Sequence, residues 1–129
     1  MNSTKPSPDE YNSKRSKNLL TSCEVKPLPK FAGKAKRLQK KYVSLANEIV
    51  ELREELRTNP TKGTPIGHSC YKIRLAIKSK GKSGGARVIT HYYIHGSTVY
   101  LLSIYDKAEQ ENIAEKKIAE LLLEIKGTE

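Results

Sequence analysis

The strongest constraint on the fold is a run of three β-forming segments between Tyr71 and Tyr105. In the first, YKIRLAIK, large apolar residues alternate with Lys72, Arg74 and Lys78. This alternation predicts a strand with one face in the core and one cationic face. The second segment, ARVITHYYIH, and the third, TVYLLSIY, are rich in β-branched and aromatic residues. A tight turn at Gly96–Ser97 would join them as an antiparallel hairpin.

Apolar residues at helical spacing flank these strands on both sides. One stripe runs from Phe31 to Tyr42 and a second from Leu45 to Leu56, which predicts a helical hairpin. Asp106 and Glu109 have the spacing of a capping box, so a third helix is expected to begin at Asp106 and to end at Gly127.

The remaining segments complete the order β-α-α-β-β-β-α. Residues 23–26 alternate as a short strand, which Pro27 and Pro29 would confine to the edge of the sheet or end. Residues 61–69 are rich in Pro, Gly and Thr and are expected to form a loop. The prediction is an α+β fold, a small mostly antiparallel sheet packed with an N-terminal helical hairpin and a C-terminal helix. Residues 1–21 are expected to be a disordered leader and residues 22–129 one domain.

Charge is distributed unevenly along the chain. The 129 residues include 24 Lys and Arg against 14 Asp and Glu, for a formal net charge of +10. Eight basic residues and no acid lie between Leu56 and Tyr105. Such a segment repels itself unless an anion compensates it, and phosphate is the obvious candidate. The alternative is that the charge run is only a solvated surface.

Several classes of protein are disfavoured. No run approaches the ~20 apolar residues that span a membrane, and the N-terminus has no apolar signal-peptide segment, so a cytoplasmic protein is expected. Cys23 and Cys70 are far apart and no metal-ligand cluster is evident, so no metal and no cofactor are expected. A loose P-loop pattern from Ala76 to Ser83 leads into a strand rather than a helix, which argues against nucleotide hydrolysis.

Three motifs resemble a known family. YKIRLA (Tyr71–Ala76), KGKSGGARVI (Lys80–Ile89) and YLLSIYDKAEQENI (Tyr100–Ile113) resemble, in this order, the RelE/ParE superfamily of type II toxins, particularly its HigB-like branch. The likeness covers about residues 22–127. It implies a RelE-like fold and a ribosome-dependent mRNA endonuclease that acts in the ribosomal A site. It also implies three partners: the ribosome, mRNA, and a cognate antitoxin with a helix-turn-helix or an acidic tail.

The resemblance also implies site residues. Matching the family's strand positions onto this chain points to Lys72, Arg74, Arg87 and Lys107. Arg87 would clamp phosphate, because a guanidinium binds two oxygens and keeps its proton; the alternative is an ion pair on the sheet face. Lys72 and Arg74 are two apart on a strand and so lie about 7 Å apart on one face. Neighbouring cations favour the neutral form of a lysine, so Lys72 is a candidate general base, and a purely electrostatic grip on RNA is the alternative.

An acid or base from the terminal helix or tail is missing. Several family members place a tyrosine or histidine there, whereas this chain has neither beyond Tyr105. The local substitutes are Tyr105 and, as further candidates, His91, Tyr93 and His95. Candidates for binding RNA or the ribosome are Lys34, Arg37, Lys40, Lys41, Lys78, Lys80 and Lys82.

Two other functions remain open at the level of sequence. A ParE-like relative would inhibit DNA gyrase without nuclease activity, and it would not need Lys72, Arg74 and Arg87. An inactive RNA-binding relative fits less well, because the chain has no Trp and one Phe to stack on bases.

Overall fold

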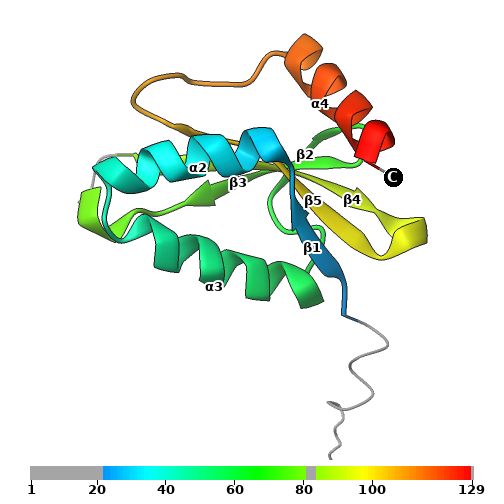
Figure 1. Cartoon of the computed structure of the whole chain (residues 1–129), viewed down its shortest axis with the longest axis horizontal. Coiled ribbons are helices and arrows are strands. Elements are labelled where there is room, and N and C mark those ends of the chain that lie inside the picture. Colours follow the sequence, from blue (N-terminus) through cyan, green and yellow to red (C-terminus); the bar gives the residue numbers. More distant parts are fainter. Residues whose placement is uncertain (1–21, 81–83, 129) are drawn as a thin grey trace, which may run out of the picture.

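The computed structural model describes residues 22–80 and 84–128 (Figure 1). The predicted leader, residues 1–21, lies outside this part of the chain. No helix within the described residues is long and apolar enough to cross a membrane. The elements in chain order are β1 (Glu24–Pro27), α2 (Pro29–Lys41), α3 (Leu45–Thr58), β2 (Thr64–Gly67), β3 (Cys70–Leu75), the 3-10 turn η2 (Lys78–Lys80), β4 (Ala86–Tyr93), the 3-10 turn η3 (Ile94–Gly96), β5 (Thr98–Asp106) and α4 (Glu115–Thr128).

The five strands form one sheet in the order β1-β5-β4-β3-β2. All neighbours are antiparallel except β1 and β5, which run parallel. β1 is the edge strand that its prolines predict, because a proline cannot donate a ladder hydrogen bond. It pairs only with Thr98–Leu101, the first half of β5. α2 packs against β5.

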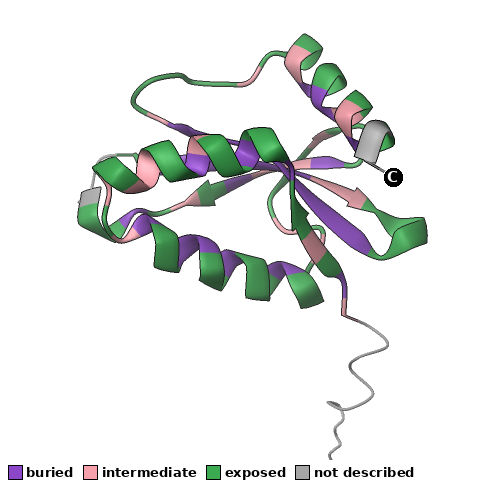
Figure 2. Cartoon of the chain, viewed as in Figure 1, coloured by how far each residue is buried: buried purple, intermediate pink, exposed green. Residues whose placement is uncertain are grey.

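Helices cover both faces of the sheet. Figure 1 shows α3 and α4 on opposite sides of it, and in Figure 2 their buried residues face the strands. One core cluster joins α2 and α3 to the sheet through residues such as Phe31, Leu52 and Ile73. The second cluster includes Ile89 and Leu121 and lies under α4. The predicted α+β class and the helical hairpin are therefore confirmed.

The predicted loop at residues 61–69 is wrong in part, because it contains β2. This strand pairs antiparallel with β3 and its register shifts between Pro65 and Gly67. The turn that follows places His68 and Ser69 both at φ 57°. β2 has only four residues, including a proline and a glycine, so its composition resembles that of a loop.

The predicted start of the last helix is also wrong. Asp106 is the final residue of β5, and α4 begins only at Glu115. The Asp106 Oδ1 atom accepts a hydrogen bond from the Ala108 amide at 2.9 Å, and the Asp106 carbonyl accepts from the Glu109 and Gln110 amides. The carboxylate therefore closes a single turn instead of beginning a helix.

Two predicted strands end earlier than their patterns suggest. β3 ends at Leu75 rather than Lys78, and β4 ends at Tyr93. His95 lies in η3, beyond the end of the strand that carries Arg87, although the segment ARVITHYYIH was predicted as one strand. Tyr92 on β4 is half-buried and packs against the first core cluster.

Candidate active site

A row of side chains crosses the middle of the sheet. Arg74 on β3 lies opposite Arg87 on β4, which lies opposite Tyr105 on β5. Residues directly opposite each other in antiparallel strands share a face. Lys72 belongs to the next row on that face, where it lies opposite Ile89. Because Ile89 packs in the cluster under α4, the cationic row lies on the α4 side of the sheet.

Four predicted cations gather around one cavity. It has a volume of about 460 Å³ and is lined by Lys72, Arg74, Arg87 and Lys107, together with Thr64, Glu111 and Asn112. The Lys72 Nζ atom donates a hydrogen bond to Asn112 Oδ1 at 3.0 Å, and Lys107 Nζ lies 3.6 Å from Glu111 Oε2. Two cations therefore have polar neighbours on the loop that precedes α4. The cavity combines several positive charges with one exposed carboxylate.

Arg87 is the most buried of these cations, with 7% of its surface exposed. Its Nη1 atom donates to the Ala86 carbonyl at 3.2 Å. No described carboxylate lies within ion-pair distance of Arg87, so the alternative of a sheet-face ion pair finds no partner in this part of the chain. A buried cation is costly unless an anion compensates it. An anion that enters the cavity would supply this compensation.

Tyr105 is the most buried residue of this row, with 4% of its surface exposed, and it does not line the cavity. Its hydroxyl has no hydrogen-bond partner within the described residues. Burial raises the pKa of Tyr105, and the nearby Arg87 charge opposes part of that shift. The hydroxyl therefore stays protonated at neutral pH and can donate a hydrogen bond.

The further candidates lie elsewhere and do not line this cavity. His91 is four residues from Arg87 along β4, about 13 Å by the rise of a strand. Its Nδ1 atom lies 2.9 Å from the His68 carbonyl oxygen, and its ring stacks on Tyr100. Tyr93 and His95 contact each other edge to face, with their ring centres 6.1 Å apart. The structure therefore does not bring these three side chains to Arg87.

The predicted RNA-binding residues fall into two groups. Lys34, Arg37, Lys40 and Lys41 lie on α2, and Lys78 begins η2. The η2 turn is tied to α3, because the Lys78 amide donates to Glu48 Oε2 at 2.6 Å and the side chains of Ser44 and Ser79 lie 2.9 Å apart. The side chain of Lys80 and the whole of Lys82 lie outside the described residues.

Sequence reasoning missed three residues that line the cavity, Thr64, Glu111 and Asn112. Thr64 belongs to the strand that was predicted as loop, and the other two lie in the segment predicted as helix. The spacing of Lys107 and Glu111 is the one signal for this contact, because residues four apart also meet on a single turn. In the described residues, no group of three His, Cys, Asp or Glu side chains could hold a metal.

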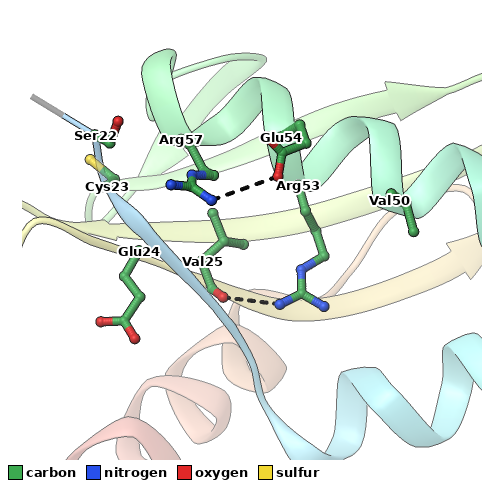
Figure 3. Close-up of a pocket in the computed structure, with 8 residues that line it drawn as sticks. All are labelled: Ser22, Cys23, Glu24, Val25, Val50, Arg53, Glu54 and Arg57. Atoms are coloured by element: carbon green, nitrogen blue, oxygen red, sulfur yellow. Dashed lines mark hydrogen bonds and ion pairs between the residues drawn. The ribbon is translucent and has the colours of Figure 1, made fainter. Parts of the chain in front are cut away.

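A second cavity, of about 490 Å³, lies between β1 and α3 (Figure 3). Its arginines have partners: Arg57 pairs with Glu54 at 3.7 Å, and Arg53 donates to the Val25 carbonyl at 3.3 Å. This cavity therefore differs chemically from the one around Arg87. Arg53 thereby supplies a partner to one backbone carbonyl of the edge strand β1 (Figure 3).

Most of the chain also matches a known protein family. Residues 35–126 match the model of the RelE toxin of the RelE/RelB toxin–antitoxin system. The chain belongs to the RelE toxin family. It is therefore a toxin of a type II toxin–antitoxin system, and the protein partner of a RelE toxin is its antitoxin. The narrower assignment to the HigB-like branch stays a prediction.

Two solved structures are similar to this RelE-family chain. A double arginine-to-alanine mutant of E. coli toxin RelE in the free state has 16% sequence identity and a TM-score of 0.51, over 81% of this chain and 98% of the other. The intact E. coli RelBE toxin–antitoxin complex has 18% identity and a TM-score of 0.41, over 66% of this chain and 96% of the other. The first of these likenesses establishes a shared RelE fold.

Proposed function

We propose that this toxin is a ribosome-dependent mRNA endonuclease. One observation carries the proposal: cations from β3, β4 and the loop after β5 line one open cavity, and the most buried of them, Arg87, has no described acid partner. A phosphodiester is the anion that fits a site of this kind, because arginine binds two phosphate oxygens at once. Family membership supports the same substrate.

The reaction needs an attack within the RNA itself. The ribose 2′-oxygen forms a bond to the adjacent phosphorus while the bond from phosphorus to the 5′-oxygen breaks. The proton of the 2′-hydroxyl passes to a base, and the leaving 5′-oxygen gains a proton. The products are a 2′,3′-cyclic phosphate and a 5′-hydroxyl. Negative charge grows on the phosphate oxygens during this step, so cations placed around them lower the barrier.

We assign roles by position in the cavity. Arg87, the most buried of the cations, binds two phosphate oxygens, and Arg74 adds positive charge from the adjacent strand. Lys72, oriented by Asn112, is the base for the 2′-hydroxyl. Lys107 lies on the loop beyond β5 and donates the proton to the leaving oxygen, because Tyr105, the strand partner of Arg87, does not line this cavity.

The first test replaces the clamp. Arg87→Ala should slow cleavage by about 10²-fold or more and relieve the growth arrest caused by induced expression. Arg53→Ala is the matched control, since that arginine lies at the other cavity and should leave arrest intact. Because Arg87 is buried, co-purification with the antitoxin checks that the variant folds, and Arg74→Ala repeats the test at an exposed position. A folded Arg87→Ala chain that stays fully toxic would contradict the proposal.

The decisive measurement maps the 5′ ends of messenger RNA after brief induction. Endonuclease activity predicts new ends inside codons that disappear when translation is blocked. Intact messages with arrested replication would instead indicate a ParE-like inhibitor of gyrase.

A further inference from the structure

A smaller cavity lies on the far side of Tyr105 from Arg74. It has a volume of about 170 Å³ and is formed between α2 and the last residues of β5. Lys34, Arg37 and Lys41 line it from α2, and Tyr105 and Asp106 line it from β5. Tyr105 therefore lines this cavity and is also the direct strand partner of Arg87, which lines the first cavity.

The two carboxylates at this cavity already interact with Lys41 and Tyr42. Asp106 Oδ2 accepts a hydrogen bond from the Tyr42 hydroxyl at 2.7 Å and lies 3.9 Å from Lys41 Nζ. Glu109 lies 3.5 Å from the same Lys41 nitrogen. Within the described part of the chain, no carboxylate lies at ion-pair distance from Lys34 or Arg37. The acids therefore leave these two cations uncompensated.

Lys34 lies close to several other positive charges. Its Nζ atom is partly buried and donates to Ser103 Oγ at 3.3 Å. Burial and the positive charges of Lys117, Arg37 and Lys30 all lower the pKa of Lys34. A lysine among like charges is stabilised when an anion binds between them.

The strand register joins the two cavities. Arg74, Arg87 and Tyr105 form one row across β3, β4 and β5, and the row continues to α2 at the second half of β5, where β1 no longer pairs. Lys72, Ile89 and Ser103 form the parallel row, which ends at Lys34. Paired residues have Cα atoms about 4.5–5.5 Å apart, so the cavities are neighbours along a line perpendicular to the strands.

We propose that the cavity at Lys34 and Arg37 is a second phosphate subsite, which binds the backbone phosphodiester next to the one held by Arg87. This inference rests on the proposed function and adds the path of the RNA, which crosses the strands from β3 over β5 to α2. The phosphate oxygens accept from Arg37 and Lys34 and offer the buried Tyr105 hydroxyl the partner that it lacks among the described residues. Lys41 is occupied by Asp106 and Glu109 and is a lesser contact.

The test is a phosphate scan of a single-stranded RNA. A fluorescent oligonucleotide with 2′-O-methyl riboses, which block cleavage, carries one neutral methylphosphonate linkage at successive positions. Its affinity for the wild-type chain, Arg37→Ala, Arg87→Ala and Lys36→Ala is measured by anisotropy at low salt. Lys36 is an exposed neighbour on α2 that does not line the cavity, so its variant removes the same charge at a different place.

Wild type should lose several-fold in affinity at two adjacent linkages. Arg37→Ala should be insensitive to one of them and Arg87→Ala to the other, while Lys36→Ala keeps both. Arg37→Ala should also lower the slope of log affinity against log salt by about 0.7, the value for one contact to single-stranded nucleic acid. Inorganic phosphate should compete only weakly with the RNA; competition as strong as that of a matched oligonucleotide would indicate a site for free phosphate and overturn the proposal.

Two outcomes separate this inference from the proposed function. If messages are cut in cells but Arg37→Ala and Lys36→Ala give the same scan, the second phosphate subsite is contradicted and the proposed nuclease activity is supported. If the scan shows both subsites but no message is cut, the phosphate path is supported and the nuclease is wrong. No measurable binding of RNA by the wild-type chain at low salt would overturn the subsite.

Discussion

Arg74 and Arg87 lie directly opposite each other on adjacent strands, an arrangement that sheets normally avoid. Two like charges at this spacing destabilise the sheet by about 0.2–1 kcal/mol. Tyr105 beside them buries a hydroxyl that has no partner in the described chain. Both features cost stability in the free protein, and an anion bound at the proposed site would offset part of that cost.

Replacing Tyr105 with phenylalanine should stabilise the protein. Tyr105→Phe removes an unsatisfied buried hydroxyl, so the free energy of unfolding should rise by about 1 kcal/mol, measured by urea denaturation. Tyr42→Phe is the control, because the Tyr42 hydroxyl donates to Asp106 at 2.7 Å and its loss should destabilise by about 1–3 kcal/mol. Equal losses in both variants would show that the Tyr105 hydroxyl has a partner.

The buried thiol of Cys70 makes stability depend on pH in the alkaline range. Burial raises the pKa of Cys70 from 9.0 to about 11. Between these values the unfolded chain has released the thiol proton and the native chain has kept it, so rising pH favours unfolding. From pH 8 to pH 10.5, wild type should lose on the order of 1 kcal/mol more than Cys70→Ala in urea denaturation. Identical losses would contradict the raised pKa.

Among the elements, α4 is the one that closes the second core. Leu121 is 1% exposed and packs in the cluster with Ile89 and Leu102, whereas Leu123 on the same helix is 65% exposed. The helix covers the face of the sheet that carries the cations, so its docking holds the cavity's surroundings in place.

Leu121→Ala should therefore lower the free energy of unfolding by about 2–5 kcal/mol, since it opens a void in the core under α4. Leu123→Ala should change it by less than about 0.5 kcal/mol. Both variants are measured by urea denaturation at constant salt. A similar loss in the two variants would mean that α4 does not pack on the sheet through Leu121.

How far the elements could be predicted depends on the strength of their patterns. The alternation in β3 placed Lys72 and Arg74 on one face correctly, and the helical stripes gave α2 and α3 because their apolar spacing is regular over three turns. β2 was not predicted, because a strand of four residues that includes Pro65 is too short to show an alternating pattern. The start of α4 was misplaced because a carboxylate before a turn looks, in sequence, like a carboxylate before a helix. The register that places Tyr105 beside Arg87 needs a sheet, and no local pattern contains it.

The whole molecule carries a formal net charge of +10, and much of that excess is concentrated on one side of the sheet and along α2. Self-repulsion of this size lowers the stability of the compact state. Two cavities there contain cations that have no acid partner within the described residues, so the electrostatic cost falls at the two proposed phosphate sites.

Salt should therefore stabilise the free chain. Raising the salt concentration from 20 to 200 mM should increase Tm by a few degrees, because the Debye length falls to about 7 Å and screens the repulsion. In Arg74→Gln the increase should be smaller and Tm at low salt higher than in wild type, as followed by differential scanning fluorimetry. A Tm that falls with salt in wild type would show that attractive ion pairs outweigh the repulsion.

The order in which the sheet is assembled has a consequence for synthesis of the protein. Lys72 and Arg74 are made well before Lys107, and β1 can pair with β5 only after Thr98–Leu101 has been made. The central row of the sheet likewise lacks its Tyr105 side until late in translation. An incomplete chain therefore has no assembled cavity, and the ribosome that makes the toxin is exposed to a competent molecule only after nearly the whole domain has emerged.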